Sequence, residues 1–154
     1  MIAVLQRVAR AAVTADGVPT GACGKGFVIL LGVLDGDTEE EARLLAEKIS
    51  KFRIFSDENG KMNLALGDIG GEVLVVSNFT LGANYSHGNR PDFMASAHPS
   101  VAEPLYEHFV ALMRERVSHV ATGVFGADMS IDMVADGPVT VVMDSEKLKK
   151  RKSV

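Results

Sequence analysis

The first third of the chain alternates between strand-like and turn-like patterns. Ile2–Val8 mixes apolar and polar residues with a period near two, which is typical of a β-strand. Ala11–Ala15 and Val18–Ala22 flank Asp16-Gly17, a two-residue hairpin signal because glycine tolerates a positive φ angle. Phe27–Leu34 is continuously apolar and predicts a strand that is buried on both faces.

The next stretch predicts a helix, a turn and a central strand. Thr38 and Glu41 fit a capping box, and apolar residues then recur at helical spacing, so a helix is expected over about 38–51. The polar run Ser56–Lys61 is typical of a turn. Glu72–Leu81 includes consecutive aliphatic residues and predicts a strand at the centre of a sheet.

A long loop and a second helix follow. Gly82–Pro99 is rich in Gly, Asn, Ser, His and Pro and has no periodicity, and long loops of this kind in small domains are commonly functional. Ser100 and Glu103 suggest a capping box, and an apolar stripe carries the helix to about Arg116. Pro104 fits the first turn poorly, because proline has no N–H to donate.

The last third returns to strands. His119–Phe125 predicts one strand, and the alternation of apolar and polar residues over Met129–Met133 predicts another. Asp136-Gly137-Pro138 indicates a turn before a final strand at Val139–Asp144. The pattern as a whole predicts an α/β (α+β) single domain with a largely antiparallel, barrel-like sheet assembly and two helices.

Composition narrows the class of protein. The chain has 154 residues, of which 47% are apolar, and this suits one globular domain. The single cysteine, Cys23, cannot form an internal disulfide. The longest apolar run is far too short to span a bilayer, and Arg7 and Arg10 follow the first apolar stretch, in the opposite order to a secretory signal. We expect a cytoplasmic protein with no membrane partner.

Charge is distributed unevenly between a domain at 1–145 and a basic tail at 146–154. The tail contains five of the 16 basic residues and one of the 20 acidic residues, so its net charge is +4 and that of the domain is −8. We expect this tail to be flexible. The acidic domain does not by itself indicate a nucleic-acid-binding protein, because duplex binding depends on neutralising phosphates.

Conventional catalytic groups are scarce. The four histidines lack metal-ligand spacing, so no metal or cofactor is expected. Ser77-Asn78-Phe79-Thr80 follows a predicted strand, where backbone N–H groups lose their sheet partners and can face an oxyanion; alternatively, the Ser77 and Thr80 hydroxyls satisfy their own turn. Gly137-Pro138 is either an ordinary turn or, if its peptide is cis, a rigid pair of carbonyl acceptors suited to an ammonium group.

Several segments together resemble the D-aminoacyl-tRNA deacylases. The resemblance runs from residue 1 to about residue 145, in family order and spacing. The segments that carry it are Met1–Val8, Gly26–Gly32, Ser77–Leu81, Gly88–Phe93, Thr122–Met129 and Gly137–Thr140.

The resemblance implies an activity and a set of site residues. Members of the family are cytoplasmic homodimers that hydrolyse the ester between a D-amino acid and the 3′-terminal adenosine of tRNA, and they also act on glycyl-tRNA, including glycine mischarged on alanine tRNA. By resemblance, Ser77–Thr80 lines the reacting ester, and a cis Gly137-Pro138 peptide reaches into the partner subunit's site. Arg7 is expected to brace that peptide. Phe125 and Met129 are expected to line the pocket for the terminal adenosine.

One residue departs from the family pattern. The motif usually reads Ser-Gln-Phe-Thr, whereas this chain has Asn78, whose amide sits on a side chain shorter by one methylene. Any direct contact from that amide should be weakened or bridged by water, while the backbone groups of Phe79 and Thr80 need not change. The alternative function is a non-catalytic module that binds the tRNA acceptor end.

Overall fold

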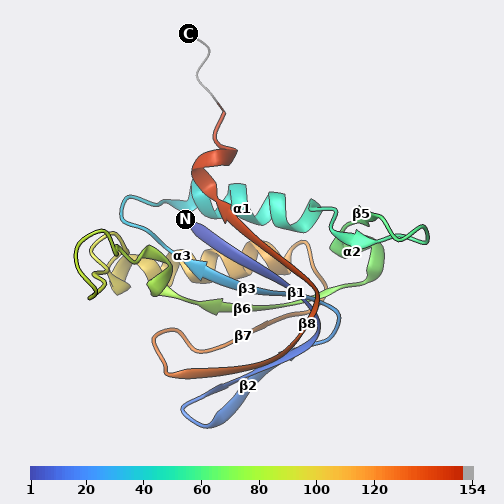
Figure 1. Ribbon diagram of the computed structural model, residues 1–154, viewed down its shortest axis with the longest axis horizontal. Coiled ribbons are helices and arrows are strands. Elements are labelled where there is room, and N and C mark those ends of the chain that lie inside the picture. Colours follow the sequence, from blue (N-terminus) through green and yellow to red (C-terminus); the bar gives the residue numbers. More distant parts are fainter. Residues whose placement is uncertain (151–154) are drawn as a thin grey trace.

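A six-stranded sheet lies at the centre of the molecule, with two long helices on one of its faces (Figure 1). The coordinates are a computed structural model that describes residues 1–150. The sheet has the order β2-β1-β3-β6-β7, with β8 pairing to the other edge of β1. Its strands are β1 (Ile2–Ala15), β2 (Val18–Cys23), β3 (Gly26–Gly32), β6 (Glu72–Ser77), β7 (Val120–Thr122) and β8 (Met129–Asp144).

The sheet is largely antiparallel, as predicted, but it also contains two parallel pairings. β1 is antiparallel to β2, β3 and β8, but β3 pairs with β6, and β6 with β7, in parallel. A helix lies in each parallel connection, α1 (Glu39–Lys51) before β6 and α3 (Pro99–Arg114) before β7. Parallel neighbours require such crossovers, and the sequence predicted both helices without revealing the parallel pairing that they imply.

The two longest strands are continuous where the sequence predicted breaks. β1 joins the predicted segments Ile2–Val8 and Ala11–Ala15, because β8 pairs along its whole length. β8 likewise runs through the predicted turn at Asp136–Pro138, where the register with β1 shifts. The predicted hairpin at Asp16-Gly17 is confirmed, with φ angles of 48° and 81°.

The sheet curls until β2 approaches β7, which nearly closes a barrel (Figure 1). Gly21 makes this approach possible, because a Cβ there would lie 2.6 Å from the Thr122 carbonyl oxygen. One apolar core lies between the sheet and the two long helices, and includes Phe27, Leu45 and Phe109. A second core fills the curl on the opposite face.

The prediction of the helices misplaced the start of α3 and omitted one short helix. α1 has the predicted capping box between Thr38 and Glu41. α3 is capped by His98 rather than by Ser100, because Pro99 suits the first helical position and the His98 Nδ1 accepts the Ser100 N–H. The short helix α2 (Leu66–Ile69) and a small hairpin of β4 (Phe55–Ser56) and β5 (Met62–Leu64) were not predicted.

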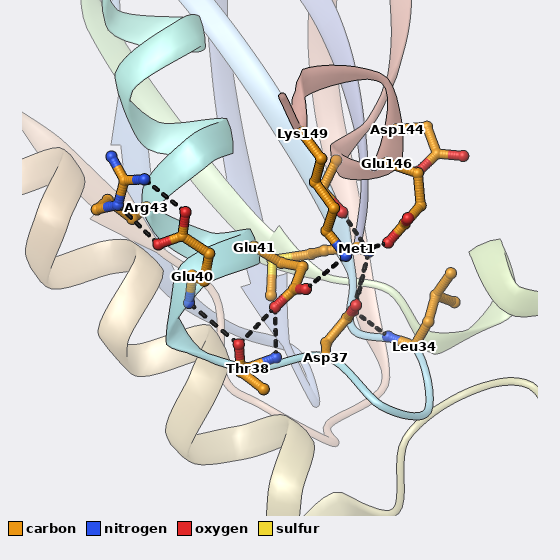
Figure 2. A network of polar contacts seen from close by, with 11 residues as sticks. Met1, Leu34, Asp37, Thr38, Glu40, Glu41, Arg43, Asp144, Glu146 and Lys149 are labelled. Atoms are coloured by element: carbon orange, nitrogen blue, oxygen red, sulfur yellow. Dashed lines mark hydrogen bonds and ion pairs between the residues drawn. The ribbon is translucent and has the colours of Figure 1, made fainter. Parts of the chain in front are cut away.

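The amino group of Met1 lies at the centre of a buried polar network (Figure 2). It donates to Asp37 Oδ1 at 3.0 Å and to Ser145 Oγ at 2.9 Å. Asp37 Oδ2 also accepts the Leu34 N–H at 2.7 Å. The network therefore ties the start of β1 to the loop after β3 and to the 3₁₀ helix η2 (Ser145–Leu148).

The first residues of the predicted tail lie against α1 rather than apart from the domain (Figure 2). Lys149 pairs with Glu41 at 2.9 Å and with Glu146 at 2.6 Å. The helix η2 and these ion pairs attach residues 146–149 to the domain, and the flexibility expected of the tail stays a prediction. The rest of the tail prediction, at 151–154, lies outside the described residues.

Glu41 should make the free energy of unfolding fall at low pH. Burial alone would raise its pKa, but hydrogen bonds from the Thr38 hydroxyl and the Lys149 ammonium outweigh burial and lower the pKa to about 2. A carboxyl with a depressed folded pKa stabilises the fold above its ordinary pKa of 4.5, and this contribution is lost as the pH falls toward 2.

We therefore expect Glu41→Gln to lower the free energy of unfolding at pH 7 and to have progressively less effect between about pH 4.5 and pH 2. Urea unfolding of both proteins across this range measures the difference. Glu39→Gln is the matched control, because Glu39 lies in the same first turn but is exposed. A difference for Glu41→Gln that stays constant with pH would contradict the prediction.

Candidate functional site

A cavity of about 870 Å³ opens where β6 ends and the long loop begins. The 3₁₀ helix η1 (Phe79–Gly82), the start of α3 and the segment before β8 surround it. Six of the predicted site residues, which come from two distant parts of the sequence, line this one cavity. They are Ser77, Asn78, Phe79, Thr80, Phe125 and Met129.

Two backbone N–H groups at the N-terminus of η1, beside the cavity, are unpaired among the residues described. Asn78 still belongs to the sheet, since its N–H donates to the Leu31 carbonyl at 2.8 Å. The Leu81 N–H then closes the 3₁₀ turn on the Asn78 carbonyl at 3.3 Å. The N–H groups of Phe79 and Thr80 precede that first bond, so neither has a partner within the helix, and no hydrogen bond joins them to other residues of 1–150.

The side chains of Thr80 and Asn78 are engaged with each other. The Thr80 hydroxyl donates to Asn78 Oδ1 at 2.5 Å. For Thr80, this meets the simpler expectation that its hydroxyl satisfies the local turn. The Asn78 amide oxygen is consequently engaged within the turn, and the backbone N–H groups of Phe79 and Thr80 remain available to a ligand, as does the Asn78 side-chain NH2.

The loop after η1 braces it from outside. Ser96 Oγ donates to the Phe79 carbonyl at 2.6 Å, and Ser96 itself is held by a β-bridge to Leu34. Gly82 leaves room for this hydroxyl, because a Cβ at that position would collide with Ser96 Oγ. The Phe79 ring also packs edge-on against Phe93, with ring centroids 5.1 Å apart. Neither Ser96 nor Gly82 was predicted, since nothing in the sequence shows that the loop folds back onto η1.

The far wall of the cavity is largely apolar. Phe125 packs against Tyr106, with ring centroids 5.9 Å apart, and Met129 also lines the cavity. The Tyr106 hydroxyl donates to the Val75 carbonyl at 2.9 Å, and burial raises its pKa to about 12. Tyr106 is therefore held neutral as part of the wall, which leaves it poorly suited to exchange protons near neutral pH.

The Gly137-Pro138 peptide does not belong to the cavity of its own chain. Both residues are exposed on β8, and the peptide is cis, which is the conformer that the resemblance implies. Arg7, which is only 8% exposed, holds the preceding residue: its Nε lies 3.3 Å from the Asp136 carbonyl oxygen and 3.2 Å from Asp136 Oδ2. Its Nη1 donates to the Ile54 carbonyl at 2.7 Å.

Gln6 braces the other side of that peptide, a contact that the sequence did not reveal. Its Nε2 donates to the Val139 carbonyl at 3.3 Å, and its Oε1 accepts the Thr140 hydroxyl at 2.7 Å. Successive residues of a strand point to opposite faces of the sheet, so Gln6 and Arg7 contact β8 on opposite faces. The polar pair Gln6-Arg7 after an apolar run was the available signal in the sequence, but it does not show that these side chains contact β8.

Other reactive groups lie outside the cavity. Burial and the nearby charge of Glu72 raise the pKa of the Cys23 thiol to about 11, so this cysteine is a poor nucleophile. Within residues 1–150, no three His, Cys, Asp or Glu side chains are arranged to hold a metal ion. None of the helices described is long and apolar enough to cross a membrane.

The chain matches the model of one protein family over residues 4–144, described as D-Tyr-tRNA(Tyr) deacylase. This chain belongs to that family. Two D-aminoacyl-tRNA deacylases illustrate the similarity. The protein from Chloroflexus aurantiacus is 54% identical over 97% of this chain and 93% of its own length, and that from Thermus aquaticus is 54% identical over 96% and 97%.

Two solved structures share the fold of this chain. A structure named c-Myc DNA Unwinding Element Binding Protein is 39% identical, covers 94% of this chain and 98% of its own, and superposes with a TM-score of 0.87. A probable eukaryotic D-amino acid tRNA deacylase, at 18% identity, has a TM-score of 0.79 over 92% and 97% of the two chains. At that identity the second match shows a shared fold.

Proposed function

We propose that this protein hydrolyses the ester bond of D-aminoacyl-tRNA and of glycyl-tRNA mischarged on alanine tRNA, releasing the free amino acid and tRNA. The observation that carries the proposal is the pair of unpartnered N–H groups at Phe79 and Thr80, at the edge of a large cavity in a chain of the deacylase family. Chiral proofreading in translation is the role that this activity serves.

The two N–H groups are the donors for the tetrahedral oxyanion. An aminoacyl ester is already labile, so stabilising its transition state accounts for much of the catalysis required. One well-placed oxyanion donor contributes about 2.7–4 kcal/mol in measured enzymes. Ser96 fixes the Phe79 carbonyl, and through it the direction of the following N–H.

Water is the nucleophile, assisted by the 2′-hydroxyl of the terminal ribose. A covalent role for Thr80 is less favoured, because its hydroxyl donates to Asn78 and no histidine, lysine or carboxylate side chain bonds to it within residues 1–150. Phe125 and Met129 form the apolar wall on which the terminal adenosine packs.

Chirality is read by exclusion across a homodimer. The carbonyls of Gly137 and Pro138 from one subunit grip the α-ammonium in the other subunit's cavity, so that an L side chain meets the carbonyl wall. Two features support this arrangement: the pair lies outside its own cavity, and it stands on an exposed strand face where Val142 is 65% exposed. A site that rejects only L side chains by steric exclusion admits any D-amino acid, and it also admits glycine.

Aminoacyl-tRNA is a cytoplasmic substrate, so we assign the protein to the cytoplasm. The deciding experiment incubates it with D-tyrosyl-tRNA and L-tyrosyl-tRNA in parallel, with and without a chelator. We expect loss of the D-ester alone, at the same rate in chelator. Binding without hydrolysis would indicate the acceptor-end binding module instead, and inhibition by chelator would indicate a metal-dependent esterase.

A further inference from the structure

A second groove, of about 630 Å³, lies between the outer face of α1 and η2 and shares no residue with the large cavity. Basic side chains stand on both of its walls: Lys48 and Lys51 on α1, Arg53 just after it, and Lys147 on η2. Its apolar lining residues are Leu44, Phe52 and Leu148. Long lysine stems can lie along apolar side chains while their ammonium groups face solvent.

The neighbouring carboxylates do not neutralise these lysines. Glu47, the acidic residue in the lining, is engaged by Arg43 at 3.0 Å and lies 3.9 Å from Arg116. Within residues 1–150, no carboxylate lies within ion-pair distance of Lys48, Lys51 or Lys147. The partial negative charge at the C-terminus of α1 favours the two helix lysines, but it does not account for Lys147 on the opposite wall.

The large cavity cannot supply the electrostatic attraction that a tRNA requires. None of the residues lining it in the described part of the chain is Lys or Arg. Arg7 is also unavailable, because it is buried and bound to Ile54 and Asp136. Affinity for nucleic acid depends mainly on cations that neutralise phosphates, so in this acidic domain they must lie outside the catalytic cavity.

We propose that this groove binds the phosphodiester backbone of tRNA beyond its acceptor end. The inference rests on the proposed function, since it names a further contact with the same substrate. Lys48, Lys51 and Lys147 neutralise phosphates from two walls, and the Arg53 guanidinium, oriented by the Asn63 carbonyl at 2.8 Å, adds a planar donor.

The test compares two triple variants of the full chain in binding uncharged tRNA over a range of salt. The groove variant is Lys48→Gln, Lys51→Gln, Lys147→Gln. The control variant, Arg10→Gln, Lys25→Gln, Lys61→Gln, removes the same charge from exposed positions elsewhere. Each phosphate contact contributes about 0.9 to the slope of log K against log salt in a duplex, so the groove variant should have a slope shallower by about 2 to 3.

The groove variant should also bind tRNA about tenfold or more weakly at low salt, while the control stays within about twofold of the parent. Both should deacylate a short D-aminoacylated acceptor-end oligonucleotide at the parental rate, because the inference assigns the groove to tRNA beyond its acceptor end. An unchanged slope in the groove variant, or a larger change in the control, would overturn the inference. So would stronger competition by polyglutamate than by tRNA, which would indicate an acidic protein partner.

Failure of the proposed function is recognised separately. If the parent protein does not hydrolyse D-aminoacyl-tRNA, the proposed activity is wrong whatever the salt slopes are. If the parent is active and the slopes of all three proteins agree, only the groove assignment is wrong. Thermal unfolding of each variant verifies that the exposed substitutions leave the fold intact.

Discussion

Arg7→Ala is expected to reduce kcat/KM for D-aminoacyl-tRNA by about 100-fold or more. Arg7 does not line the cavity of its own chain, but it fixes Asp136, the residue before the Gly137-Pro138 carbonyls. Displacing a positioning group by about 1 Å can cost two orders of magnitude in rate. The substitution also leaves the Ile54 carbonyl without its buried donor, which should lower the free energy of unfolding by about 1–3 kcal/mol.

The selectivity between D- and L-tyrosyl-tRNA shows whether Arg7 positions the carbonyl pair or only stabilises the fold. Arg10→Ala is the matched control, because Arg10 lies on the same strand and is exposed. We expect that control to keep both activity and stability. The Arg7 variant should also discriminate less between D- and L-tyrosyl-tRNA. A variant that loses stability but retains parental selectivity below its melting temperature would show that Arg7 does not position the carbonyl pair.

Asp37→Asn should cause the largest loss of stability of any single substitution considered. Asp37 faces the Met1 ammonium at 2.9 Å, and both groups are almost fully buried. Asparagine can still accept the Leu34 N–H, but it leaves a buried charge without its counter-charge. Removing one partner of a buried ion pair typically costs about 3–5 kcal/mol, and urea unfolding at pH 7 measures this directly.

Asp35→Asn provides the control for Asp37→Asn. Asp35 lies two residues earlier in the same loop, but it is exposed, and its backbone N–H donates to Ala95. We expect a change below about 0.5 kcal/mol for this control. Equal effects of the two substitutions would mean that the network around Met1 contributes little beyond the general charge of the loop.

Local patterns predicted most elements of this fold, and long-range pairing accounts for the differences. The capping box at Thr38 and the hairpin at Asp16-Gly17 are decided within four residues, so the sequence was sufficient. The continuity of β1 depends on β8, more than a hundred residues away. The start of α3 was misplaced because a histidine cap is uncommon and Ser100 offered the more usual signal.

The site was predictable in its parts but not in its assembly. The family resemblance predicted Ser77–Thr80, Phe125 and Met129 as site residues, and the fold brings these residues to one cavity. Periodicity could not reveal the supports, because Gln6 and Ser96 act across 133 and 17 residues of sequence. Such contacts follow from the packing of β8 on β1 and of the long loop on η1.

Gly82 and Ser96 have a consequence for how this sequence can vary. The space that a methyl group would occupy at position 82 is filled by the hydroxyl that holds the Phe79 carbonyl. A chain with alanine at 82 would have to give up that hydroxyl, and one without it would leave a gap beside the glycine. The effects of substitutions at these two positions, fourteen residues apart, are therefore coupled. The turn stays rigid only if both residues are kept or both are replaced in a compatible way.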